Sequence, residues 1–149
     1  KNINERGAYF QSQGFGQQSW PDCGEIDILE HWGKDQNHAQ SAIHTRSSHG
    51  NTVNLGGQVI PTISSEFHVY ALDWTPEKLV FSVDGKHHYT YNPSIKNQAT
   101  WPFDSPQYVL LNFAIEKVID PEFTEASFDI DYVRIYDDKG AAVFTDEFN

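Results

Sequence analysis

Three acidic side chains, Glu25, Asp27 and Glu30, lie within six residues of one predicted β-strand. Successive side chains of a strand point to opposite faces, so Glu25 and Asp27 share one face, and the isoleucines that alternate with them share the other. An unbroken strand would place Glu30 among these isoleucines, where a buried charge is unfavourable. One extra residue at Ile28–Leu29, a β-bulge, returns Glu30 to the acidic face. The spacing therefore predicts a bulged strand whose three acids face a common groove.

Paired carboxyl groups can divide the work of glycoside hydrolysis. Two neighbouring carboxyl groups do not ionise equally easily, so one stays charged while the other keeps its proton. Hydrolysis with retention uses such a pair, a nucleophile and an acid roughly 5–5.5 Å apart. A strand rises ~3.3 Å per residue and a bulge shortens the path, which gives Glu25 and Glu30 about this separation. From spacing alone, a solvated acidic edge or a calcium-binding face is the alternative.

The segment from Trp20 to Glu30 reads Trp-Pro-Asp-Cys-Gly-Glu-Ile-Asp-Ile-Leu-Glu. It closely resembles the active-site signature of glycoside hydrolase family 16, in the six-residue Glu-x-Asp-x-x-Glu form of the laminarinase-type endo-β-1,3-glucanases. The resemblance implies Glu25 as nucleophile, Glu30 as general acid/base and Asp27 as their helper. It continues in family order through Ile43-His44-Thr45, Asp73-Trp74-Thr75-Pro76, Val83-Asp84-Gly85, Trp101-Pro102-Phe103-Asp104, Leu111-Asn112-Phe113-Ala114 and Ile130-Asp131-Tyr132-Val133-Arg134.

Five further residues are expected to bind substrate. The bulged register places Trp32 on the face of Glu30, where its ring can stack on a sugar. The resemblance implies the same stacking role for Trp20 and Trp101, around the subsites of the groove. It also implies a role for His44, on a strand that borders the site, and for Asn112, within its matching motif. For each tryptophan, packing in the core is the alternative.

The resemblance implies no cofactor for catalysis, but it does imply a structural calcium away from the groove. Asp131 is the best candidate ligand, and Glu147 joins it if the C-terminal stretch is equivalent to the family's opening strand. The alternative is that both are ordinary surface acids. The histidines show no zinc-like spacing, since His87 and His88 are adjacent and so face opposite ways on a strand.

Composition restricts the class of protein. The chain has 149 residues, a formal net charge of −11 and 14% aromatic residues. Such acidity argues against nucleic-acid binding, which requires a basic footprint. No apolar run approaches the ~20 residues of a membrane-spanning helix. The resemblance, rather than the composition, implies a β-glucan polysaccharide as partner, and neither nucleic acid nor membrane is expected. The sole cysteine, Cys23, excludes an intrachain disulfide and is expected to be a packed thiol.

Short alternating runs predict an all-β fold, a two-sheet antiparallel β-sandwich that the resemblance makes a concanavalin-like β-jelly roll. Residues 1–149 are expected to form part of a single family 16 catalytic domain. Asp84-Gly85 between two alternating runs predicts a two-residue hairpin. The expected strands beyond the catalytic one are 39–46, 66–74, 78–83, 86–91, 107–115 and 127–136.

By comparison with the family, the jelly roll is expected to be incomplete in this chain. Residues 1–19 read as an irregular surface segment, and the strands that precede it in the family are not in the sequence. The stretch 142–149 resembles the opening strand of a family module, which indicates a split or rearranged fold unless this short likeness is accidental. A complementary fragment, or a second copy of the chain, would then complete the sandwich.

These observations favour a retaining endo-β-glucanase acting on β-1,3 (laminarin) or mixed β-1,3/1,4-glucan. One alternative is an algal galactan hydrolase of the agarase or carrageenase kind, which shares the bulged strand. Another is a non-catalytic β-glucan-binding module. Glu116-Lys117-Val118 stands where many family members have paired glycines. The resemblance therefore does not determine the shape of the substrate groove. The size of the substrate and the resemblance together imply a secreted or periplasmic protein.

Overall fold

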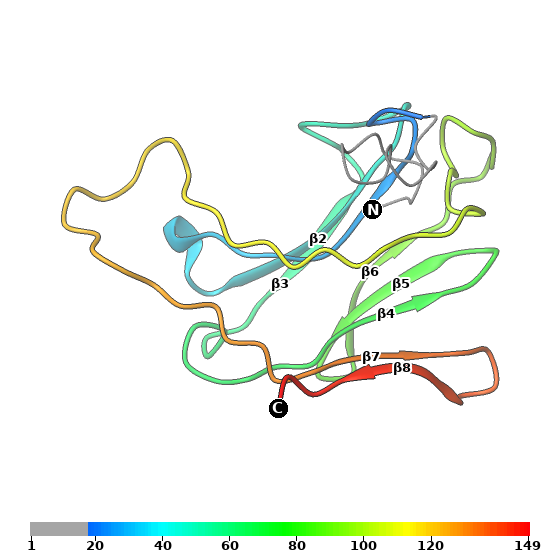
Figure 1. Ribbon diagram of the computed structural model, residues 1–149. Helices are drawn as coiled ribbons and strands as arrows, with labels where there is room; N and C mark the ends of the chain where they lie inside the picture. Colours follow the sequence, from blue (N-terminus) through cyan, green and yellow to red (C-terminus); the bar gives the residue numbers. More distant parts are fainter. Residues whose placement is uncertain (1–17) are drawn as a thin grey trace. The chain divides into compact units, whose positions relative to one another are not determined.

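A computed structural model describes residues 18–149, and the regular secondary structure of these residues is β-strand apart from one short 3₁₀ helix (Figure 1). The chain divides into two compact units, the first ending at Leu110 and the second comprising Leu111–Asn149. The all-β prediction is confirmed. Within the described part of the chain, no helix is long and apolar enough to span a membrane. The predicted irregular segment 1–19 lies outside the described residues, apart from its last two. A single domain over residues 1–149 stays a prediction.

The first unit contains two three-stranded antiparallel sheets. One sheet has the order β1-β2-β3 and the other the order β4-β5-β6. A short 3₁₀ helix, η1 (Gly33–Asp35), follows β1. The strands are β1 (Glu25–Glu30), β2 (His38–His44), β3 (Leu55–Val59), β4 (Tyr70–Trp74), β5 (Leu79–Val83) and β6 (Lys86–Tyr91).

The turn between β5 and β6 is the hairpin that the sequence predicts. Asp84 and Gly85 both have positive φ angles, 50° and 75°. Both central residues of a tight type I′ turn need this conformation, which aspartate tolerates and glycine adopts without strain. The turn therefore fixes the β5–β6 pairing locally.

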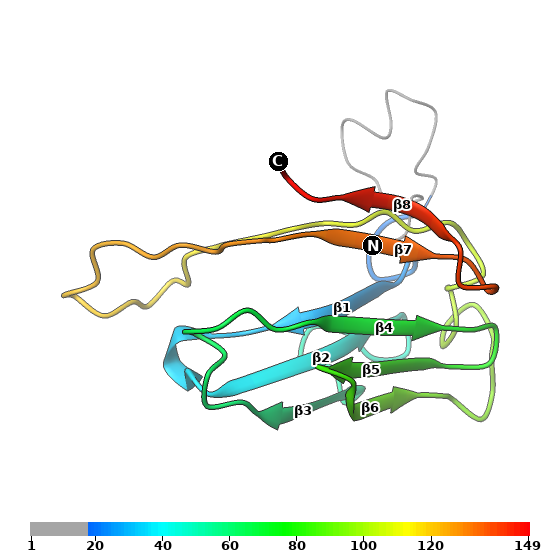
Figure 2. The same ribbon diagram turned by 90° about the horizontal axis from the view of Figure 1, so that it is seen from below.

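The two sheets face each other across one hydrophobic core (Figure 2). The side chains of β5 alternate between buried and half-buried, as expected for a strand with one face on a core. The predicted sandwich is thus present in this unit. Its buried core residues are Ile43 from β2, Leu79 and Phe81 from β5, Tyr91 from β6, and Trp101 and Phe103 from the loop that follows.

The second unit contains one antiparallel hairpin, β7 (Val133–Tyr136) paired with β8 (Ala142–Asp146). The strand predicted at 107–115 does not form, and the one predicted at 127–136 is shortened to β7. Several apolar side chains of 107–115 are exposed, among them Phe113 at 62% and Ile115 at 71%. A strand that is apolar on both faces needs covering layers and ladder partners, and no strand of the described residues pairs with this segment.

His68 connects the segment before β4 to the β5–β6 turn. Its Nδ1 lies 2.7 Å from Asp84 Oδ2, and the backbone N–H of Val69 donates to Asp84 Oδ1 at 2.8 Å. The hydrogen bond between the two side chains raises the pKa of His68 and lowers the pKa of Asp84. The His68 side chain is 8% exposed, whereas that of Asp84 is 52% exposed.

We predict that Asp84→Asn destabilises the protein in a pH-dependent way. The raised pKa of His68 contributes stability that is fully present below its unfolded value of about 6.5 and is lost as the pH rises through the folded value. At pH 5.5 the variant should lose roughly 0.5–1 kcal/mol, since Asp84 is half exposed and solvent screens the pair. At pH 8.5 the loss should be smaller.

Urea denaturation at the two pH values measures this difference. Asparagine keeps a turn residue that tolerates positive φ, and it keeps an acceptor for Val69. Asp73→Asn is the matched control, because it removes the same charge from an exposed residue of β4. An equal loss of unfolding free energy at both pH values in Asp84→Asn would contradict the ion pair.

Candidate active site

The pairing of β1 with β2 contains the predicted bulge. Between two paired positions, three steps along β1 match only two steps along β2, so β1 carries one extra residue between Asp27 and Glu30. The acids pair with alternate residues of β2, namely Glu25 with His44, Asp27 with Ala42 and Glu30 with Gln40. Alternate residues of a strand share a face, so the three acids lie on one face of the sheet. Within the bulge, Ile28 is 37% exposed rather than buried.

Trp20 lies directly against Glu25. Its indole Nε1–H donates to Glu25 Oε2 at 2.6 Å. The ring centroid of Trp20 lies 6.0 Å from that of His44 and 5.3 Å from that of His49. The Trp20 side chain is 38% exposed, so part of its ring faces solvent beside the acidic face. The structure therefore brings the first tryptophan of the signature to the site.

The other two acids contact side chains of β2. His44 Nε2 lies 3.3 Å from Asp27 Oδ2, and both side chains are largely buried. The amide Nε2–H of Gln40 donates to Glu30 Oε2 at 3.1 Å. Sequence reasoning missed Gln40, although alternation from His44 along β2 places it on the same face. One strand thus supplies the acids and its neighbour orients two of them.

A tight turn places Trp20 at the start of β1. The backbone N–H of Asp22 donates to Ser19 O at 2.9 Å, and that of Gly24 donates to Pro21 O at 3.0 Å. Arg46, just after β2, donates to both carboxylate oxygens of Asp22. This interaction lowers the pKa of Asp22 and raises that of Arg46. The ion pair connects the turn to the neighbouring strand, and sequence reasoning did not identify it.

Gly24 allows the core to approach the first catalytic candidate closely. It has φ +74°, and a Cβ at this position would lie 2.6 Å from Pro102 Cγ and 2.7 Å from Phe103 Cε1. Any larger residue would displace either this loop or the start of β1. Cys23, beside it, is fully buried, as expected for a packed thiol.

The structure corrects the expectation for Trp101. Its side chain is only 4% exposed and belongs to the hydrophobic core. The ring stacks on Tyr91 at a centroid distance of 6.0 Å, and its Nε1–H donates to Asp104 Oδ1 at 3.1 Å. A ring so enclosed has no face on which a sugar can stack. The alternative of core packing is therefore correct here.

Two further expected substrate-binding residues stay predictions. Trp32 is the second residue after the end of β1 and is half-buried, with Lys34 Nζ 5.8 Å from its ring centroid. Asn112 is an exposed residue of the second unit.

Asp131 and Glu147, the predicted calcium ligands, both lie in the second unit. Glu147 accepts two hydrogen bonds from Arg134, each at 2.9 Å, and this interaction lowers its pKa. Asp131 is exposed in the same unit. Among residues 18–149, no group of three or more His, Cys, Asp or Glu side chains is placed to hold a metal ion. The structure gives the predicted calcium no support, and it stays a prediction.

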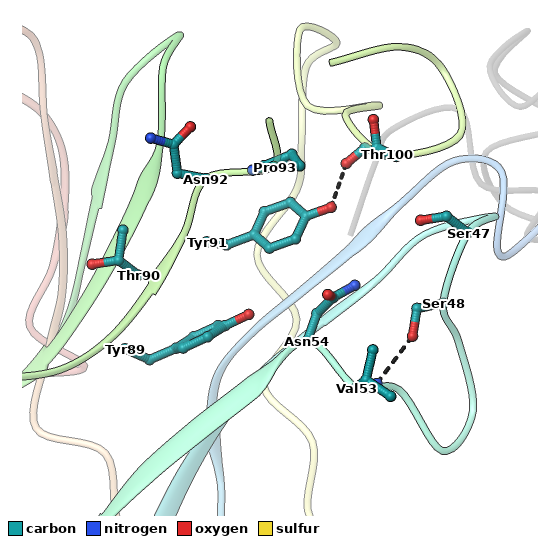
Figure 3. A pocket seen from close by; sticks show the side chains of 10 residues that line it. All are labelled: Ser47, Ser48, Val53, Asn54, Tyr89, Thr90, Tyr91, Asn92, Pro93 and Thr100. Carbon is teal, nitrogen blue, oxygen red and sulfur yellow. Dashed lines mark hydrogen bonds between the residues drawn. The ribbon is translucent and has the colours of Figure 1, made fainter. Parts of the chain in front are cut away.

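A separate hollow of about 400 Å³ lies in the first unit and shares no residue with the acidic face (Figure 3). Tyr89 and Tyr91 of β6 and the loops after β2 and β6 line it. The Tyr91 hydroxyl donates to the backbone carbonyl of Thr100 at 2.6 Å. Burial raises the pKa of Tyr89 to about 12, so this phenol stays protonated at neutral pH. Nothing in the lining could act as an acid–base pair.

The sequence of the chain matches a known protein family and a bacterial relative. The family model "Glycosyl hydrolases family 16" matches residues 6–134. A β-glucanase of Rhodothermus marinus is 36% identical over 137 residues, which cover 83% of this chain and 48% of that protein. This chain therefore spans about half of that relative's length.

Two solved structures are similar to the chain. The laminarinase from Flavobacterium sp. UMI-01 matches with a TM-score of 0.59 and 49% identity over 60% of this chain and 39% of the laminarinase. SCLam, a non-specific endo-β-1,3(4)-glucanase, matches with a TM-score of 0.56 and 36% identity over 58% of this chain and 34% of its own. The part of the chain that matches thus corresponds to less than half of each of these two proteins.

We predict that Arg46→Gln loosens the turn that carries Trp20. Without the ion pair to Asp22, the indole should sample more positions, so its ¹⁹F resonance in 5-fluorotryptophan-labelled protein should shift and broaden. Trp20→Phe assigns that resonance among the four tryptophans. Lys78→Gln, which removes an exposed positive charge before β5, is the control and should leave the resonance unchanged. An unchanged Trp20 signal in Arg46→Gln would contradict the role of the ion pair.

Proposed function

The chain belongs to glycosyl hydrolase family 16, and from this premise we propose that it carries the catalytic strand of a retaining endo-β-glucanase. The substrate that we propose is a β-1,3-glucan or a mixed β-1,3/1,4-glucan. The observation that carries the proposal is the bulge in β1, which brings Glu30 to the face of Glu25 and Asp27. The chain spans half or less of the length of the relatives compared above. For this reason the activity of those relatives is a proposal for this chain.

The proposed mechanism is a double displacement. Glu25 attacks the anomeric carbon while Glu30 protonates the departing glycosidic oxygen, which leaves a glycosyl ester on Glu25. Glu30, now a carboxylate, removes a proton from water as that water attacks the same carbon. The ester bond breaks, and both side chains return to their starting forms with the β configuration retained.

Neighbouring residues would hold these groups in place. The Trp20 indole donates to one carboxylate oxygen of Glu25, which fixes the orientation of the nucleophile. Gln40 does the same for Glu30. Asp27 lies between them in the strand and contacts His44, so we assign it the role of helper. A catalytic pair held in one geometry avoids the entropic loss of ordering it in each turnover.

Two observations support a β-glucan as substrate. The relatives compared above are named as a β-glucanase, a laminarinase and an endo-β-1,3(4)-glucanase. The partly exposed ring of Trp20 lies beside the nucleophile, and such a face can pack on the apolar side of a sugar ring. A β-glucan polysaccharide is a large polymer that is degraded outside the cytoplasm, so we propose a secreted or periplasmic location.

Incubation with laminarin, lichenan, agarose and carrageenan, followed by profiling of released oligosaccharides, tests the proposal. We expect products from laminarin, lichenan or both, with ¹H NMR showing the β anomer as the first product formed. Products from agarose or carrageenan alone would assign a galactan hydrolase instead. Binding of laminarin without any products would assign a non-catalytic module.

We predict that Glu25→Gln abolishes turnover but leaves polysaccharide binding intact. Loss of the nucleophile should lower kcat by at least ~10³-fold, while affinity electrophoresis in laminarin-containing gels should show unchanged retardation. Glu77→Gln, at an exposed residue of the β4–β5 turn, is the matched control and should keep full activity. Full activity in Glu25→Gln would exclude the mechanism.

We also predict that azide rescues Glu30→Ala. Without its acid/base, the variant should still form the glycosyl ester from a substrate with a good leaving group, such as an aryl β-glucoside oligomer. A small anion can then attack the anomeric carbon in place of activated water. Mass spectrometry and NMR should detect a β-glycosyl azide. An α-glycosyl azide, or none with substantial activity remaining, would contradict the role of Glu30.

A further inference from the structure

The bulge in β1 needs support that the regular β-ladder does not give. An extra residue in one strand disrupts the ladder locally, so backbone groups at the bulge must find other partners. One such group is the carbonyl of Ile28, which accepts a hydrogen bond from Ser41 Oγ at 2.8 Å. A side chain of the neighbouring strand thus replaces a ladder bond at the position where the register shifts.

Ser41 reaches the bulge from the face opposite to the acids. It lies in β2 between Gln40 and Ala42, whose side chains are on the acidic face, so alternation directs Ser41 to the core side. The residue is fully buried. It contacts the bulge without occupying any part of the groove in which substrate would bind.

A histidine of the other sheet orients the Ser41 hydroxyl. His88, in β6, has its Nε2 2.9 Å from Ser41 Oγ. A hydroxyl has one proton, and Ser41 uses it on Ile28, so it must accept from an Nε2–H of His88. The Nδ1 of His88 is then an acceptor, and Gln58 Nε2 lies 3.4 Å from it. The donors therefore follow one direction, from Gln58 to His88 to Ser41 to Ile28.

The surroundings of His88 agree with this assignment. Burial lowers the pKa of His88, with smaller contributions from the neighbouring His87 and His38. The ring is therefore neutral at neutral pH and carries one N–H. Its centroid lies 6.4 Å from that of the core residue Phe81. A neutral ring with one donor and one acceptor nitrogen is what the direction of the hydrogen bonds requires.

We propose that Ser41 and His88 are positioning residues for catalysis, because their hydrogen bonds fix the carbonyl of Ile28 and thereby the separation of Glu25 and Glu30. The inference rests on the proposed function, in which that separation decides whether the two carboxyl groups can act on one glycosidic bond. Neither residue touches substrate. The bulge is thus held by the packing of one sheet on the other.

Removal of the Ser41 hydroxyl tests this positioning role. In Ser41→Ala, kcat on laminarin should fall by about 10–100-fold, with KM and laminarin binding close to those of the unchanged protein. His88→Gln keeps a neutral N–H donor and should keep more activity than His88→Phe. This ordering separates a hydrogen-bonding role from the filling of space.

Thr52→Val is the matched control. Thr52 is also buried, and its hydroxyl donates to a carbonyl of β2, that of Ile43, at 2.8 Å. Loss of this bond should lower the melting temperature as Ser41→Ala does, because each removes one buried hydroxyl. Only Ser41→Ala should lower kcat. Equal kcat in the two variants, at similar melting temperatures, would overturn the proposal.

A readout that needs no activity separates this inference from the proposed function. Long-range ¹H–¹⁵N NMR of the whole chain should show His88 as the neutral Nε2–H tautomer. An Nδ1–H or a charged ring would overturn the assigned direction of the hydrogen bonds. Hydrogen exchange of residues 28–30 should be faster in Ser41→Ala than in Thr52→Val, and equal rates would also overturn it. Suppose that the tautomer of His88 and the exchange rates are as expected, but the unchanged protein hydrolyses no polysaccharide. The proposed function alone would then be refuted.

Discussion

The unfavourable burial of the Glu30 carboxylate is the constraint on which the acidic site depends. In an unbroken strand this carboxylate would enter the core beside Ile26, where a charge without a partner is strongly unfavourable. The extra residue of β1 removes this conflict and places Glu30 opposite Gln40. The same irregularity that protects the core gathers three acids on one face. Stability and the geometry of the site therefore have a common cause.

The remaining contacts of the site depend on this register. Gln40 of β2 meets Glu30 because the bulge shifts the pairing after Asp27. His44 meets Asp27 in the regular part of the ladder that precedes the bulge. The turn before β1, fastened through Asp22 to Arg46, brings Trp20 to Glu25. Local turns and one cross-strand register thus assemble the site within about thirty consecutive residues.

Features governed by local patterns could be predicted from the sequence. The Asp84-Gly85 hairpin and the bulge both follow from neighbouring residues, the first from turn chemistry and the second from a visible conflict of faces. Trp101 could not be placed correctly, because its burial depends on the path of a long loop over the core. The strand expected at 107–115 depends on distant partners. The contact between Ser41 and His88 joins residues 47 apart, and no local pattern indicates it.

A crystal structure of Glu25→Gln with a bound laminari-oligosaccharide would test the central claim most directly. The account predicts that Asp27 pairs with Ala42 and Glu30 with Gln40, and that the side chains at positions 25 and 30 lie roughly 5–5.5 Å apart across one glycosidic bond. An uninterrupted ladder that directs Glu30 to the core, with the sugar bound elsewhere, would contradict it.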